Sequence, residues 1–173
     1  MKRLPILKIA FALLFLFLFT FAPLRLGVSP IATAHAAGSS NSYSIQWGES
    51  RTGRMAVVTW VWVADSSNAT VPDSALSTTH AGLLKYFFAD MGETIPGGVT
   101  APTALYDVTL EDDNDMDVFG GKLTNRSDTA KEQVLPAIGG ALGDRPIHSG
   151  LTLKIANNSV NDATGTVIIT FIK

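Results

Sequence analysis

The chain has 173 residues, 46% of them hydrophobic, no cysteine, and a formal net charge of −2. The length is that of one domain, and the lack of cysteine excludes disulfides and Cys-based metal sites. No basic stripe of the kind that binds nucleic acid is present.

The first 36 residues have the order of a secretory signal peptide. A start with three Lys or Arg residues precedes an apolar run at 9–22, and Ala-His-Ala follows at 34–36. This order predicts cleavage after Ala36. A membrane anchor is the competing interpretation, but the run of about 14 apolar residues is shorter than the roughly 20 that span a bilayer. A start codon drawn too far upstream is a third interpretation.

Cleavage would export residues 37–173 to the periplasm or the extracellular space, and only the signal peptide would meet a membrane. With the alternative start, the protein would instead be cytoplasmic or part of a virion. The exported part keeps nine Lys and Arg against 15 Asp and Glu, a net charge of −6. This acidity also argues against a nucleic-acid partner.

Residues 37–42 are rich in Gly and Ser and are expected to form a flexible leader before a domain over 43–173. Residues 43–47 alternate apolar and polar side chains, which predicts a short strand. Residues 55–64 give the strongest strand pattern, with two apolar faces, and they predict a central strand covered on both sides. The two faces are Ala56, Val58, Trp60 and Trp62, and Val57, Thr59, Val61 and Val63.

The middle of the chain predicts further strands. Residues 69–79 are small and polar, as in an exposed strand or loop. Residues 82–91 tolerate a helix, but the bracketing Gly82 and Gly92 favour a strand. Residues 105–119 predict a hairpin whose turn holds the acids of 111–115, since these cannot be buried.

The C-terminal third continues the pattern. Residues 127–133 predict one helical turn, because Ser or Asp suits an N-cap. Residues 134–142 are apolar but broken by Pro136 and a Gly pair, as in an edge strand or a packed loop. Residues 151–172 predict a second hairpin with a long loop. Seven to nine strands at about ten-residue spacing indicate an all-β, single antiparallel β-sandwich or jelly-roll-like domain.

The acidic turn is the sharpest chemical feature of the sequence. Asp113, Asp115 and Asp117 have the D-x-D-x-D spacing of a calcium loop. Val118 and Thr124 stand where that loop needs Gly and Glu. The three aspartates are therefore weak metal candidates, and a solvated turn is the favoured interpretation.

No catalytic constellation emerges from the sequence. His80 and His148 stand far apart and belong to no metal-ligand motif. Ser149 lies outside a G-x-S-x-G elbow, and no phosphate-binding glycine loop occurs. We therefore predict a protein that is not an enzyme and has no cofactor.

Three blocks resemble a group of small, β-rich, virion-associated bacteriophage proteins. They are Ala-Pro-Thr-Ala-Leu-Tyr-Asp-Val-Thr-Leu at 101–110, Asp-Val-Phe-Gly-Gly at 117–121 with its continuation to 134, and Leu-Thr-Leu at 151–153 with Gly-Thr-Val at 165–167. The resemblance extends over about residues 44–173. It implies a particle-building or particle-decorating protein, and it carries over no catalytic residue. A signal peptide departs from this resemblance, because virion proteins assemble in the cytoplasm.

The leading functional hypothesis is a non-enzymatic structural or interaction protein, such as a decoration, head or tail component of a phage particle. Its partners would be other proteins, through self-association or assembly onto a particle. The alternative is a secreted binding module for carbohydrate with a weak calcium site. In that case Trp47, Trp60 and Trp62 would supply surface contacts, although core packing is favoured for Trp60 and Trp62.

Overall fold

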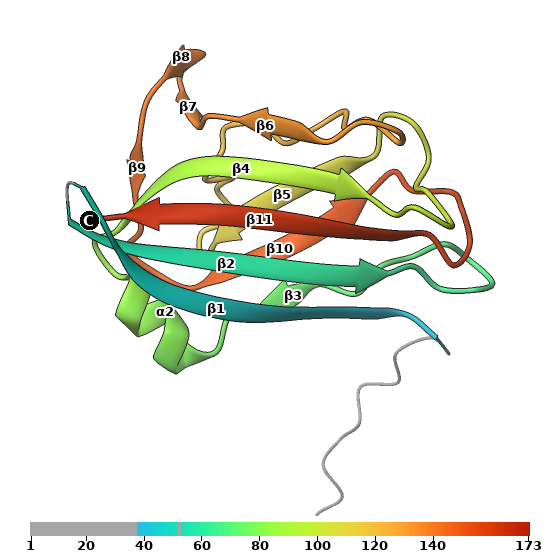
Figure 1. Ribbon diagram of the computed structural model, residues 1–173, viewed down its shortest axis with the longest axis horizontal. Coiled ribbons are helices and arrows are strands. Elements are labelled where there is room, and N and C mark those ends of the chain that lie inside the picture. Colours follow the sequence, from blue (N-terminus) through green and yellow to red (C-terminus); the bar gives the residue numbers. More distant parts are fainter. Residues whose placement is uncertain (1–37, 52) are drawn as a thin grey trace, which may run out of the picture. The chain divides into compact units, whose positions relative to one another are not determined.

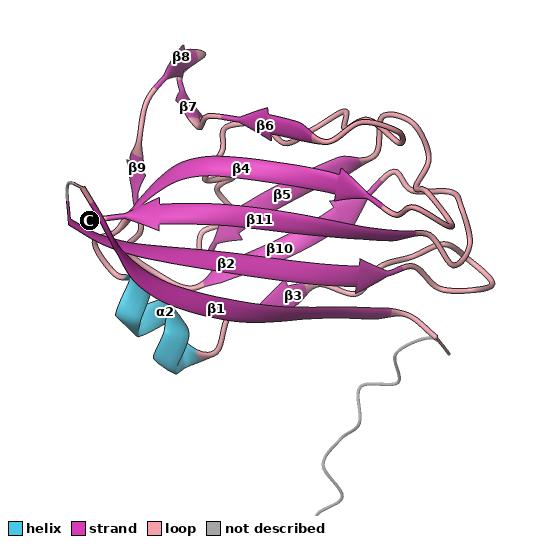
Figure 2. Ribbon diagram, in the orientation of Figure 1, coloured by secondary structure: helices cyan, strands magenta, loops and turns pink. Residues whose placement is uncertain are grey.

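The computed structural model describes residues 38–51 and 53–173, so the signal peptide expected over 1–36 lies outside the described residues. The described chain forms two layers of antiparallel strands, with a short helix beside them (Figures 1 and 2). The all-β class and the antiparallel sandwich predicted from the sequence are therefore confirmed.

The larger sheet has the strand order β1-β2-β11-β4-β6, and β9 also pairs with β4. Its strands are β1 (Ser40–Ser50), β2 (Gly53–Val63), β4 (Phe88–Pro96), β6 (Glu132–Val134), β9 (Arg145–Pro146) and β11 (Thr164–Ile172). The smaller sheet, in the order β3-β10-β5, contains β3 (Ser74–Ala75), β5 (Asp107–Asp112) and β10 (Leu151–Ala156). The remaining described elements are the helix α2 (Thr78–Leu84) and a small hairpin of β7 (Ala137–Ile138) and β8 (Ala141–Leu142).

The hydrophobic core lies between the two sheets. Alternate side chains of β2 and β11 face the core, and those of β5 and β10 meet them from the other layer. Ala56, Val58, Trp60 and Trp62 are all fully buried, as the predicted strand face requires. The other predicted face of β2 is not covered: its side chains are half-buried or exposed, and Val61 is 50% exposed.

One predicted hairpin and one predicted strand are wrong. Local alternation does not report which strand a segment pairs with, and a short apolar run suits a helix as well as a strand. The expected hairpin over 151–172 does not form, since β10 pairs with β5 and β11 pairs with β2 and β4. The loop between β10 and β11 instead crosses from one layer to the other. The expected strand over 82–91 is split into the end of α2 and the start of β4.

The helix that replaces this strand starts with a local signal. The Ser77 side chain caps α2 by accepting a hydrogen bond from the His80 N–H (3.2 Å), and Leu84 anchors the helix in the core. Tyr86 then takes a positive φ of 68°, and the chain turns into β4. Gly82 lies inside the helix and does not mark an element boundary.

Three smaller corrections concern segment ends. β1 begins at Ser40, so residues 40–42, expected in the flexible leader, pair with β2. The return arm of the hairpin predicted over 105–119 is a series of turns and not a strand, held to β5 by the Val118 N–H donating to the Leu110 carbonyl (2.8 Å). The helical turn predicted over 127–133 is also absent from the described chain, and Ser127 Oγ caps a bend at Thr129 and Ala130.

Candidate interaction surface

The side of the larger sheet that points away from the core forms a continuous face across four long strands. We define this outer face by the residues that alternate with the core-facing ones on each strand. They are Ser42, Ser44 and Gln46 in β1, Val57, Thr59, Val61 and Val63 in β2, Met91, Glu93 and Ile95 in β4, and Thr166, Ile168, Thr170 and Ile172 in β11. In Figure 1 no described element lies over β2 and β11 on this side.

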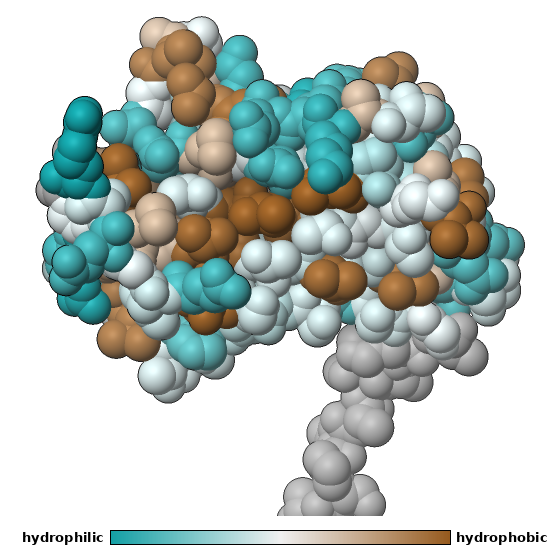
Figure 3. Space-filling model, in the orientation of Figure 1, coloured by the Kyte–Doolittle hydropathy of each residue, from teal (hydrophilic) through white to brown (hydrophobic). Residues whose placement is uncertain are grey.

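The outer face is almost uncharged. Its charges lie on β4 alone: Glu93, whose Oε2 accepts a hydrogen bond from Gln133 Nε2 at 2.8 Å, and the half-buried Asp90 at the bulge beside Met91. Figure 3 views this side: brown and pale residues occupy its middle, and most of the teal ones lie at its borders. An antiparallel sheet with one solvated face normally alternates apolar and polar residues, so β-branched aliphatic side chains on both faces of β2 and β11 are unusual.

The β1 edge of the sheet is attached to α2 by a polar cluster. The Tyr43 hydroxyl accepts a hydrogen bond from the Ser77 N–H (2.8 Å) and lies 3.0 Å from Nδ1 of His80. Asn41 Nδ2 donates to the Pro72 carbonyl at 3.0 Å. His80 is thus a structural partner of Tyr43, and these contacts hold β1 against the segment that leads into α2.

A second apolar feature is the β7–β8 hairpin, which projects from the sheet in Figure 1. Ile138 and Leu142 are 53% and 68% exposed, and a hollow of about 370 Å³ lies between Ile138, Met116 and Arg145. The sequence predicts only an edge strand or a packed loop for this segment. Its signal was a Gly pair within residues 135–143, a stretch that contains no charge.

In the acidic turn, the carboxylates of Asp113 and Asp117 accept hydrogen bonds from backbone N–H groups of the protein. Asp113 Oδ2 accepts from the Gly150 N–H (2.8 Å), and Asp117 accepts from the Phe119 and Gly121 N–H groups. Asp115, at a positive φ of 57°, occupies the turn. Within residues 38–51 and 53–173, no group of three His, Cys, Asp or Glu side chains lies together closely enough to hold a metal ion.

The two preceding acids are paired with bases. Glu111 forms a salt bridge with Lys154, and its hydrogen bond raises the pKa of the Lys154 ammonium. Asp112 lies 3.4 Å from Arg145 and also accepts from the Asn114 and Met116 N–H groups. The turn is therefore less repulsive than its composition suggests, because each carboxylate of these pairs faces a cation or an N–H group.

A pocket of about 320 Å³ lies between α2 and the loop that precedes β10. It brings Lys85, Asp113, His148 and Ser149 to one rim. Ser149 Oγ accepts from the Asp113 N–H (3.2 Å), and the exposed His148 ring meets Tyr86 edge-on at 5.9 Å. Ser149 therefore attaches the loop to the acidic turn, while His148 packs against Tyr86.

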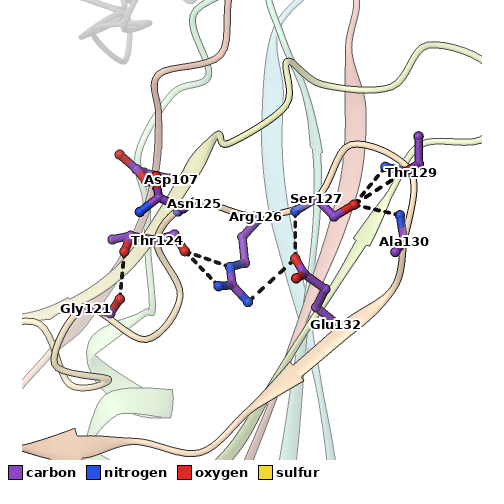
Figure 4. Close-up of polar contacts among 9 residues, drawn as sticks. All are labelled: Asp107, Gly121, Thr124, Asn125, Arg126, Ser127, Thr129, Ala130 and Glu132. Atoms are coloured by element: carbon purple, nitrogen blue, oxygen red, sulfur yellow. Dashed lines mark hydrogen bonds and ion pairs between the residues drawn. The ribbon is translucent and has the colours of Figure 1, made fainter. Parts of the chain in front are cut away.

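Arg126 is the centre of a further polar cluster (Figure 4). Its guanidinium donates to the Thr124 carbonyl and lies 3.6 Å from Glu132, whose Oε2 also accepts from the Ser127 N–H at 2.6 Å. Asp107 accepts from the Asn125 N–H at 2.7 Å. The cluster fixes the loop between β5 and β6, and each of these groups is occupied by backbone or by its partner.

The three tryptophans do not form a common surface. Trp60 and Trp62 are fully buried, which confirms the core-packing interpretation. Trp47 is 41% exposed and meets Phe87 edge-on, with ring centroids 6.0 Å apart. In this structure only Trp47 among the three offers a ring to solvent.

Comparisons with known proteins give little. No family model and no curated protein matches the chain. Separately, no helix among the described residues has the length and apolar character to cross a bilayer. A solved structure, the cyanophage Pam1 capsid asymmetric unit, matches with a TM-score of 0.30 and 16% sequence identity, over 82% of this chain and 90% of that one. A likeness at this level carries no conclusion about this chain.

Proposed function

We propose that this chain is a non-enzymatic structural subunit that assembles with other protein subunits in a phage-like particle, as a decoration, head or tail component. The observation that carries the proposal is the outer face, where aliphatic side chains of β2, β4 and β11 are only partly buried and Val61 is 50% exposed. Contiguous exposed apolar surface of this kind marks protein interaction sites. The sequence resemblance to virion-associated phage proteins supports the particle as the kind of assembly.

A charge placed on the outer face tests the proposal. Val61→Lys puts an ammonium on the face, and Val99→Lys makes the same substitution at a loop residue that is fully exposed. The full chain and both variants would be examined by sedimentation velocity, over concentrations up to the millimolar range, and by electron microscopy. We expect wild type and Val99→Lys to associate, and Val61→Lys to shift toward monomer.

The contrary result is equally definite. The wild type would then stay monomeric at millimolar concentration, while Val61→Lys would be neither more soluble nor more monodisperse than wild type. In that case the outer face has no partner, and the proposal fails.

The carbohydrate-binding alternative finds no support in the geometry. A stacking platform needs at least two aromatic rings side by side at the surface. Trp60 and Trp62 are buried, and Trp47 alone is partly exposed.

A further inference from the structure

We propose that the partner at the outer face is a second copy of this chain, stacked face to face about a two-fold axis. The inference rests on the proposed function and adds the identity of the partner. Two properties of the face carry it: its charge and its extent.

The charge argument concerns which surfaces two copies can bring together. Residues 37–173 carry a net charge of −6, so most orientations of two copies oppose like charges. The acids of 111–117 belong to the end of β5 in the smaller sheet and the turn that follows it, away from the outer face. On the outer face the acids are confined to β4: Glu93, whose carboxylate accepts a hydrogen bond from Gln133, and Asp90 at the bulge, while the central strands β2 and β11 contribute none. Two such faces can therefore meet without opposing acidic clusters.

The extent of the face matches what a stable dimer needs. Four strands of 9 to 11 residues form it. At about 3.3 Å per residue and 4.8 Å between strands, nine residues by four strands cover roughly 570 Å² per copy. Two copies give about 1,100 Å² before side-chain relief is added, and a specific interface needs about 1,000 Å².

The proposed packing is one that sheets adopt readily. Aligned sheets stack about 10 Å apart at an angle near −30°, with β-branched side chains interdigitated. In a two-fold interface of this kind the axis passes through the centre of the patch, so central residues meet their own copies. Thr59 and Ile168 are paired neighbours at the middle of β2 and β11, and they mark that centre.

The absence of cysteine makes the test direct, because one introduced thiol is unique in the chain. The full chain with Thr59→Cys would be treated with a bis-maleimide of about 10 Å span, the spacing of packed sheets. Val99→Cys is the control, and Ile168→Cys is the second face variant if Thr59→Cys lowers the melting temperature. We expect covalent dimer as the main product from either face variant, and at least tenfold less from Val99→Cys.

Three results would overturn the inference. Association that Val61→Lys abolishes, without cross-linking of the face variants, would mean that copies of the chain meet through this face in another geometry, and the proposed function would stand. A monomer whose introduced thiol resists maleimide would mean that residues 1–37 of the same chain cover the face. A monomer with a freely reactive thiol would leave the face uncovered, and it would contradict the proposed function as well.

Discussion

Gly165 in β11 lies opposite Trp62 in β2, and a Cβ atom on Gly165 would come within 2.5 Å of the Trp62 indole. The buried indole occupies the space that any side chain at this position would need. The pair explains why the central strand carries a glycine where its neighbours are β-branched.

Gly165→Ala should therefore destabilise the fold. Overpacking a well-filled core costs about 1–3 kcal/mol, and the rigid ring cannot move aside without displacing its neighbours. Chemical denaturation would measure the loss. Gly98→Ala is the control, since a Cβ there meets nothing within 4 Å. Equal midpoints for the two variants would refute the packing argument.

Tyr43→Phe should loosen the attachment of β1 to α2. The substitution removes the hydroxyl that accepts from the Ser77 N–H and contacts His80. We expect a loss of about 1 kcal/mol and faster amide exchange at Ser77. Tyr86→Phe, at a ring that is 55% exposed, should change stability by much less. An unchanged exchange rate at Ser77 in Tyr43→Phe would count against this role.

Tyr106 should make the protein sensitive to alkali. Burial raises the pKa of Tyr106 to about 12, against a smaller opposing effect of the nearby Thr94 hydroxyl. The unfolded phenol ionises near pH 10 and the folded one near 12, so the folded state binds more protons between these values and stability falls as pH rises. The full difference corresponds to about 2–3 kcal/mol.

The measurement compares wild type with Tyr106→Phe, because other groups also titrate at high pH. Free energies of unfolding would be determined from pH 8 to 11.5. We expect the variant to gain on wild type steadily above pH 10. A difference in unfolding free energy that stays constant with pH would show that Tyr106 has the same pKa in the folded and unfolded states.

Calcium should not stabilise the acidic turn specifically. Asp113 and Asp117 already accept backbone hydrogen bonds, so a cation would have to displace them. Millimolar CaCl₂ should raise the melting temperature no more than NaCl of equal ionic strength. A larger rise that disappears in Asp115→Asn would reveal a cation site after all.

The sequence predicted those features that depend on local alternation. The buried and outward sides of β2 follow from residues 55–64, because side chains on a strand point alternately to its two faces. What covers the outward side does not follow, since two apolar faces suggest a covered strand and no described element provides the cover. The outer face is thus the second apolar side of β2, which no described element covers.

The strands with which β10 and β11 pair could not be predicted from the sequence. Both segments alternate well, and a hairpin is the default for neighbouring strands. Their separation into two sheets depends on β5, which lies about 40 residues before β10 and pairs with it. Likewise, α2 was missed because the apolar run over 82–88 suits a helix or a strand, and the Ser77 cap that starts the helix lies outside this run.

The position of β11 affects when the protein can fold. β11 (Thr164–Ile172) lies between β2 and β4, so the two halves of the larger sheet share no strand pairing until it has been made. The larger sheet therefore cannot be completed during synthesis until these residues have left the ribosome. Loss of residues 164–172 would remove the middle of the sheet and not its margin.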